Sequence, residues 1–144
     1  MNITEGEMPK VAAFICGLNP LPRIIILRGE VGSGKTTLVK QLLKQLDSED
    51  DVSSPTFSII NEYKTRKGEI IYHSDWYRVK DVSELQDAGI EDYLFGNNML
   101  IIEWPEIGEI LFDGLPHLEI DIEYQGYFRN YRIKTMNITG EKSM

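Results

Sequence analysis

The clearest pattern of apolar and polar positions lies between residues 23 and 46. Ile24 to Leu27 form a short apolar, β-branched run, which is typical of a strand buried in a parallel sheet. After a glycine-rich gap, apolar residues return at helical spacing, with lysine and glutamine on the opposite face. These helical positions are Leu38, Val39, Leu42, Leu43 and Leu46. The pattern therefore predicts a buried strand, a loop and an amphipathic helix in direct succession.

The rest of the chain divides into shorter segments. Alternating or wholly apolar runs predict strands over 57–63, 69–73, 99–102, 117–124 and 128–136. Polar turns between the first two and between the last two of these strands predict two antiparallel hairpins. Helical turns are predicted over 11–16, 82–88, 91–95 and 105–111, the second of them opened by a capping box of Asp81 and Glu84.

The loop between the predicted strand and helix carries a specific motif. Residues Gly29 to Thr36 read G-E-V-G-S-G-K-T and match the P-loop pattern G-x-x-x-x-G-K-[ST] at every fixed position. Glycines let backbone N–H groups turn toward a phosphate, and the start of the helix adds its positive dipole end. Lys35 is expected to reach the β- and γ-phosphates, and the Thr36 hydroxyl is expected to bind Mg²⁺. The alternative, a turn without a ligand, is disfavoured because the predicted strand, loop and helix all fit the structural context of a P-loop.

This organisation predicts one domain over residues 1–144, with 137–144 as a flexible tail. The expected fold is a three-layer α/β P-loop NTPase-like domain with a mixed parallel/antiparallel sheet. The residues expected to bind the phosphates are Gly29, Glu30, Val31, Gly32, Ser33, Gly34, Lys35, Thr36 and Thr37.

Two acidic residues stand just beyond predicted strands. Asp75 follows the strand 69–73 and Glu103 follows the strand 99–102. The carboxyl ends of strands border the ligand crevice of an α/β sheet, so both carboxylates are candidates for a contact with Mg²⁺. We expect Thr36 and Glu103 to contact Mg²⁺, directly or through water, and Asp75 to orient the attacking water. The reverse assignment of the two acids stays open.

Three nearby residues allow two interpretations each. Thr56, in a Ser-Pro-Thr-Phe segment after the P-loop helix, is either a switch residue that senses the γ-phosphate or an ordinary turn residue. Trp104 is either a core aromatic residue, which is the more common role, or a flat surface near the nucleotide. His73 is more often a satisfied structural histidine than a ligand.

Composition limits the classes of function. The chain has 144 residues, of which 42% are hydrophobic, and this supports a globular core. A formal net charge of −8 argues against broad binding to nucleic acid, which needs a basic face. No apolar run reaches the length of a membrane span, and no signal peptide is recognised. The single cysteine, Cys16, excludes an intrachain disulfide, and a cytoplasmic location is expected.

The order of motifs resembles the TsaE (YjeE) family of small bacterial ATPases. The P-loop occurs in many families, but the ordered set of later motifs is far more specific. These motifs are Ser54-Pro55-Thr56-Phe57, His73-x-Asp75-x-Tyr77-Arg78 and Glu103-Trp104-Pro105, followed by an apolar hairpin with Arg129 and Arg132. One departure is Trp76, which stands where the family usually has an aliphatic residue.

The resemblance implies that the protein binds ATP and Mg²⁺ and hydrolyses ATP slowly. It also implies two partners, TsaB and TsaD, which make the threonylcarbamoyladenosine modification beside the tRNA anticodon, and contact with tRNA only through that complex. Trp104 and Arg129 are expected to contact the nucleotide in addition to the P-loop. The expected catalytic residues are Lys35, Thr56, Asp75 and Glu103, acting by positioning and charge neutralisation.

Three other functions fit parts of the sequence. A P-loop kinase acting on a small molecule or nucleotide is permitted by the P-loop, but the chain is short for a second substrate site and shows no arginine-rich lid. A GTP-binding switch is disfavoured because the sequence contains no [NT]-K-x-D motif. The third is a binding module in which ATP only orders an interface.

Lys64, Arg66 and Lys67 form a basic turn that is either a partner contact or a solvated loop.

Overall fold

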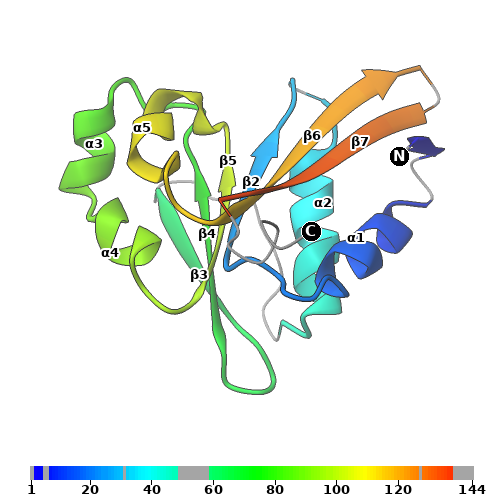
Figure 1. Ribbon diagram of the computed structural model, residues 1–144, viewed down its shortest axis with the longest axis horizontal. Helices are drawn as coiled ribbons and strands as arrows, with labels where there is room; N and C mark the ends of the chain where they lie inside the picture. Colours follow the sequence, from blue (N-terminus) through cyan, green and yellow to red (C-terminus); the bar gives the residue numbers. More distant parts are fainter. Residues whose placement is uncertain (1, 5–6, 31, 49–58, 127, 138–144) are drawn as a thin grey trace.

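The computed structural model describes residues 2–4, 7–30, 32–48, 59–126 and 128–137 (Figure 1). The strands are β1 (Asn2–Thr4), β2 (Ile24–Arg28), β3 (Ile60–Lys64), β4 (Ile70–Asp75), β5 (Met99–Glu103), β6 (His117–Gln125) and β7 (Phe128–Met136). The helices are α1 (Met8–Cys16), α2 (Lys35–Gln45), α3 (Val82–Asp87), α4 (Ile90–Leu94) and α5 (Glu109–Phe112), with the 3₁₀ helix η2 (Pro105–Gly108) before α5. Within these residues, none of the helices has the length and apolar character needed to cross a membrane.

The strands of the described residues form one seven-stranded mixed sheet in the order β1-β7-β6-β2-β5-β4-β3. The central strand β2 pairs in parallel with β5 and β6, and β4 pairs in parallel with β5. The two predicted hairpins are confirmed as the antiparallel pairs β3–β4 and β6–β7. The edge strand β1 pairs antiparallel with β7 and was not predicted, because three residues are too few to show a hydrophobic period.

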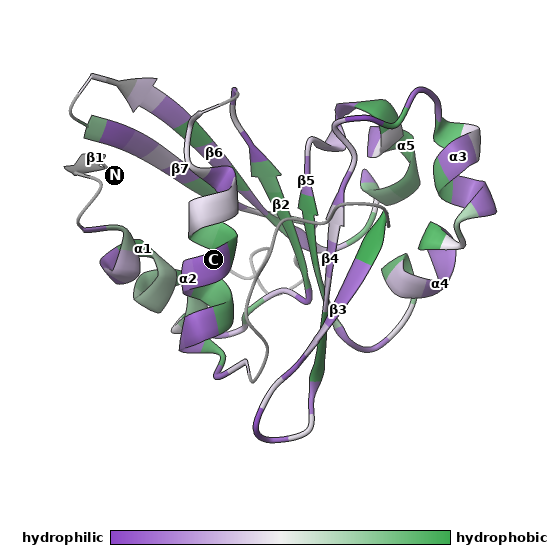
Figure 2. Ribbon diagram, turned by 180° about the vertical axis from the view of Figure 1, so that it is seen from behind, coloured by the Kyte–Doolittle hydropathy of each residue, from purple (hydrophilic) through white to green (hydrophobic). Residues whose placement is uncertain are grey.

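Helices cover both faces of this sheet, so the predicted three-layer α/β fold is confirmed (Figure 1). The helices α1 and α2 lie on one face, and α3, α4 and α5 lie on the other. Because side chains alternate along a strand, Ile25 and Leu27 of β2 pack with α1 and α2, whereas Ile24 and Ile26 face the opposite layer. Figure 2 accordingly shows β2 and β5 as the most hydrophobic strands.

Two helix starts differ in detail from the expectation. The Asp81 side chain caps α3 by accepting a hydrogen bond from Ser83 N at 2.9 Å. Glu84 accepts from Lys80 N at 3.4 Å, so the reciprocal bond to Asp81 N that defines a capping box is not made. The helix expected over 105–111 begins as the 3₁₀ turn η2 and continues as α5.

Trp76 fills the core between the sheet and α5. Its side chain is buried, its ring centroid lies 6.1 Å from that of Phe112, and its Nε1 donates to Ser74 Oγ at 2.7 Å. This large ring leaves no room for a side chain at Gly108. A Cβ there would lie 2.6 Å from a ring carbon of Trp76 and 2.7 Å from Leu85 Cδ1. Trp76 therefore requires a glycine at the end of η2.

The substitution Gly108→Ala should lower the free energy of unfolding by about 1–3 kcal/mol, because the added methyl group overpacks the contact with Trp76. Gly114→Ala is the matched control, since nothing lies within 4 Å of a Cβ at that position. Urea unfolding followed by circular dichroism measures both variants. The cost of Gly108→Ala should shrink in a Trp76→Leu background, and an equal cost in both backgrounds would contradict this packing argument.

Candidate nucleotide-binding site

The P-loop joins the carboxyl end of β2 to the start of α2, as predicted. Its described glycines have positive φ angles of 155° at Gly29, 82° at Gly32 and 103° at Gly34. A Cβ at Gly29 would lie 2.6 Å from Ser33 Oγ and 2.8 Å from Ile122 O. A side chain at this position would therefore clash with these atoms, and the positive φ angle would also strain its backbone. The local geometry therefore requires a glycine where the motif begins.

Lys35 is the first residue of α2, and its buried side chain reaches back to the start of the loop. Its exposed fraction is 5%, and its ammonium group donates hydrogen bonds to Gly29 O and, at 3.1 Å, to Glu30 O. The same group lies 3.8 Å from the centroid of the Trp104 ring. Burial lowers the pKa of Lys35, and the nearby carboxylate of Glu103 acts in the opposite direction. A cationic side chain is thus held at the position where the motif predicts a phosphate contact.

Glu103 ends β5 and lies against the start of α2. Its side chain is 2% exposed, and its Oε1 accepts a long hydrogen bond of 3.4 Å from Thr36 Oγ1. Its Oε2 lies 2.6 Å from Nε2 of His73. In nucleotide sites, Mg²⁺ is held through oxygen atoms, usually by one or two protein groups together with phosphate and water. The hydroxyl of Thr36 and the carboxylate of Glu103 therefore fit the ion that the sequence predicts.

Asp75 lies beside Glu103 on the neighbouring strand. The two residues are partners in the parallel pairing of β4 with β5. Asp75 Oδ1 accepts a hydrogen bond from Tyr77 N at 2.9 Å, which fixes the carboxylate at the end of the strand. Burial raises the pKa of Asp75, and the Glu103 carboxylate adds to this increase against the effect of the Tyr77 N–H group. A raised pKa suits a carboxylate that accepts a proton from water.

Trp104 does not belong to the core, so the more common of its two interpretations is wrong. It is half-buried, and its ring centroid lies 4.7 Å from that of Tyr77. Its backbone has φ 56° and ψ 60°, a left-handed conformation that is uncommon for a bulky residue and is concentrated at functional sites. The core tryptophan is instead Trp76. Trp104 and Tyr77 form an aromatic wall beside Lys35.

Arg129 belongs to β7, which lies on the other side of β2 from β5 in the sheet, whereas Trp104 directly follows β5. Its Nε donates to Ser33 O at 2.7 Å, and its guanidinium carbon lies 5.5 Å from the ring centroid of Tyr124. A Cβ at Gly34 would lie 3.1 Å from Arg129 Nε. Arg129 therefore holds the backbone of the loop, in addition to the nucleotide contact that is predicted for it.

Most of the predicted site residues line one pocket of about 380 Å³. Its lining residues are Gly32, Ser33, Gly34, Lys35, Thr36, Thr37, Asp75, Tyr77, Glu103, Trp104 and Arg129. Gly29 and Glu30 line an adjoining pocket of about 550 Å³ that reaches Tyr124 at the end of β6. Val31 and Thr56 lie outside the described residues, so their predicted roles stay predictions.

Two residues of the site were not singled out from the sequence. Tyr77 was noted only as part of a family motif. The sequence around it gives no independent signal that its ring contacts Trp104. His73 was interpreted as structural, yet it contacts the carboxylate that fits Mg²⁺. Its position two residues before Asp75 was the available signal, because residues i and i+2 of a strand share one face.

Comparison with known proteins identifies relatives along almost the whole chain. The sequence model of the family described as "Threonylcarbamoyl adenosine biosynthesis protein TsaE" matches residues 3–133. The tRNA threonylcarbamoyladenosine biosynthesis protein TsaE of Haemophilus influenzae is 37% identical over 112 residues, which cover 76% of this chain and 68% of the relative. The protein of the same name from Aquifex aeolicus is 40% identical over 105 residues, covering 72% and 73%.

A solved structure supports the fold independently. The crystal structure of YdiB from Bacillus subtilis has a TM-score of 0.70 with this chain and covers 99% of it and 88% of its own length. The sequence identity is 22%, so this likeness concerns the fold alone. The family model and the two relatives indicate the same family, and the motifs around the pocket agree with it. The chain therefore belongs to the TsaE family.

Proposed function

We propose that this protein is a Mg²⁺-dependent ATPase that binds ATP at the P-loop and hydrolyses it slowly. The observation that carries the proposal is the convergence of Lys35, Thr36 and Glu103 on one pocket at the carboxyl ends of the central strands. These groups supply a cation for phosphate and oxygen ligands for Mg²⁺. They meet the main needs of phosphoryl transfer, which are positioning and charge neutralisation.

Each side chain has a separate task in this proposal. Lys35 exchanges its hydrogen bonds to the carbonyls of Gly29 and Glu30 for bonds to phosphate oxygens. Asp75, whose pKa is raised, orients a water molecule and accepts its proton. Trp104 shields the ammonium group of Lys35 from solvent on one side. Thr36 and Glu103 would hold Mg²⁺, which would supply neutralisation of the phosphate charge.

We further propose that the protein acts with TsaB and TsaD as an accessory subunit in the threonylcarbamoyladenosine modification of tRNA. The printed names of its relatives support the pathway, and the sequence resemblance supports the two partners. A chain with a net charge of −8 has little electrostatic attraction for tRNA. Contact with tRNA through the partner proteins is therefore more consistent with its charge than direct binding.

The β3–β4 hairpin offers a physical link between the nucleotide site and a partner. Arg66, in the turn of the hairpin, forms an ion pair with Asp47, which follows α2. Arg66 N also donates to Asp47 O at 3.0 Å. The far end of the P-loop helix is therefore tied to a basic surface turn. A displacement of α2 upon phosphate binding would move this turn.

Removal of the Lys35 ammonium tests the ATPase proposal. Lys35→Ala should weaken ATP binding about 10- to 100-fold, because a hydrogen bond to a charged group is worth about 1.5–3 kcal/mol. Lys40→Ala, on an exposed part of the same helix, is the matched control and should bind as the wild type does. Isothermal titration with ATP and Mg²⁺ measures both. Unchanged affinity in a folded Lys35→Ala variant would rule out the P-loop assignment, and phosphate transfer to an added metabolite rather than to water would favour the kinase alternative.

Nucleotide-dependent assembly tests the partner proposal. Gel filtration of the protein mixed with TsaB and TsaD should show stronger complex formation with ATP or a slowly hydrolysed analogue than with ADP. The expected difference in affinity is about 5-fold or more, the lower end of typical coupling between two binding sites. Equal assembly in all three nucleotide states would mean that the nucleotide does not control the partner surface.

A further inference from the structure

The described part of the sheet contains two His–Glu pairs in which the histidine is buried. His73 Nε2 lies 2.6 Å from Glu103 Oε2, and His117 Nε2 lies 3.2 Å from Glu119 Oε1. The side chains of both histidines are 1% exposed. The two pairs differ in their remaining contacts, and this difference separates a structural pair from one that serves the nucleotide pocket.

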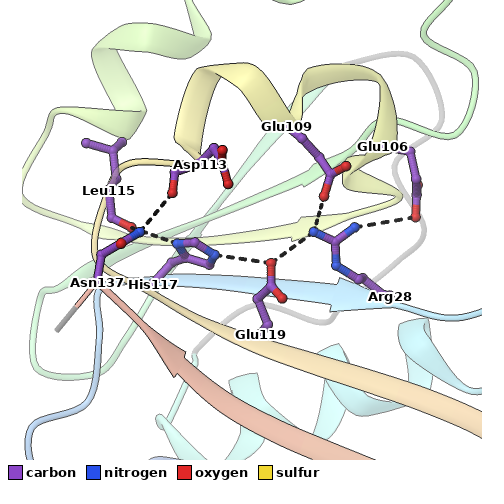
Figure 3. Close-up of polar contacts among 8 residues, drawn as sticks. All are labelled: Arg28, Glu106, Glu109, Asp113, Leu115, His117, Glu119 and Asn137. Atoms are coloured by element: carbon purple, nitrogen blue, oxygen red, sulfur yellow. Dashed lines mark hydrogen bonds and ion pairs between the residues drawn. The ribbon is translucent and has the colours of Figure 1, made fainter. Parts of the chain in front are cut away.

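The His117–Glu119 pair belongs to a closed network of ion pairs and hydrogen bonds (Figure 3). Glu119 Oε1 also accepts from Arg28 at 2.9 Å, and Arg28 is paired in turn with Glu109 of α5. His117 Nδ1 makes its own bond, of 2.7 Å, with Leu115 O. Although burial opposes the effect, hydrogen bonds from Arg28 and His117 lower the pKa of Glu119. Both nitrogens of this histidine are used, and the carboxylate has an arginine as partner, so the pair is structural.

The His73–Glu103 pair is less complete. Within the described residues, Nδ1 of His73 is buried and has no hydrogen-bond partner. A buried polar atom without a partner costs about 1–3 kcal/mol. Its neighbours in the sheet are the buried aliphatic residues Ile71 and Ile101 and, on β3, Asn61, whose Nδ2 is also buried without a partner among the described residues. An aliphatic residue at position 73 would avoid the cost at Nδ1, so packing against Ile71 and Ile101 gives no reason for a histidine.

Glu103 gives that reason. Because an ionised carboxylate can only accept hydrogen bonds, His73 Nε2 carries the proton in this contact. The bond occupies Oε2 and leaves Oε1 beside the Thr36 hydroxyl at the pocket. Among the described residues, no arginine pairs with Glu103, in contrast to Glu119. One oxygen of Glu103 is therefore fixed by the protein, while the other faces the site.

We propose that His73 is a positioning residue that orients the Glu103 carboxylate so that Oε1 and the Thr36 hydroxyl together receive the Mg²⁺ that accompanies ATP. This inference rests on the proposed function, which requires Mg²⁺ at Thr36 and Glu103. Metal ligands are commonly oriented by such an outer hydrogen bond, and the loss of this bond typically costs 10- to 100-fold in metal affinity.

Two substitutions separate the hydrogen bond from the bulk of the side chain. The amide nitrogen of glutamine reaches about as far as Nε2 of histidine, so His73→Gln can still donate to Glu103. The amide of asparagine reaches only as far as Nδ1, so His73→Asn loses the bond. His117→Asn is the matched control, because it breaks the other buried His–Glu pair on the same sheet.

The experiment measures ATP affinity over a range of Mg²⁺ concentrations and again in EDTA, and Mn²⁺ binding in the presence of ATP by electron paramagnetic resonance. His73→Asn should raise the Mg²⁺ requirement and weaken Mn²⁺ binding about 10-fold or more. His73→Gln should stay close to the wild type, and ATP affinity in EDTA should be the same in all variants. His117→Asn should lower the melting temperature without a change in the Mg²⁺ requirement.

Distinct results contradict the inference and the proposed function. A wild-type Mg²⁺ requirement in folded His73→Asn, or an equal loss of affinity in EDTA and in Mg²⁺, would overturn the positioning role. If His73→Asn does not fold, a raised Mg²⁺ requirement in folded His73→Gln would overturn it as well. Failure of the wild-type protein itself to bind ATP with Mg²⁺ would overturn the proposed function, and the inference with it.

Discussion

The parallel pairing of β2 with β5 brings the P-loop and Glu103 together at the candidate nucleotide pocket. Leu27 is the register partner of Glu103, so the last residue of β5 stands beside the penultimate residue of β2, two residues before the P-loop begins. On its other side, Glu103 is the partner of Asp75 in β4. A shift of one residue in either pairing would turn the acidic side chain to the opposite face of the sheet. The site therefore depends on this register, because only the observed pairing brings the carboxylate of Glu103 to the start of α2.

This arrangement places polar groups where the core would favour apolar ones. Lys35, His73 and Glu103 are all buried, and they meet at the edge of the layer packed by α1 and α2. Their charges are partly balanced: the carboxylates of Glu103 and Asp75 act to raise the pKa of Lys35 against the effect of burial, and Lys35 acts to lower the pKa of Asp75. Burial also makes such interactions stronger than they would be in water. The pocket is therefore a local departure from the most stable packing, at one edge of a regular sheet.

The sequence was informative where signals are local or periodic. The strand 24–27, the P-loop and the α2 face were predicted because each pattern depends on a few adjacent residues. The roles of Trp76 and Trp104 could not be separated in this way, since burial depends on the packing of α5 and on the left-handed backbone at Trp104. The contact of His73 with Glu103 joins residues 30 positions apart, and only the register of β4 with β5 brings them together.

The division of labour that we propose for the two acids is based on their different environments. Glu103 is buried, bonded to His73 and close to Thr36, which suits a fixed metal contact. Asp75 is half-buried at the pocket and has a raised pKa, which suits the orientation of water. Because the contacts differ, the same neutralising substitution should have different consequences at the two positions.

The most direct test of this account is the Mg²⁺ dependence of ATP binding and of single-turnover hydrolysis in Glu103→Gln and Asp75→Asn. Glu103→Gln should weaken Mg²⁺-dependent ATP affinity by about 10-fold or more, the scale expected for the loss of a charged metal contact. Asp75→Asn should bind ATP and Mg²⁺ nearly as the wild type does but hydrolyse ATP about 100-fold more slowly, as expected for the loss of a general base. The opposite pattern, with the Mg²⁺ requirement raised by Asp75→Asn and unchanged by Glu103→Gln, would contradict the account.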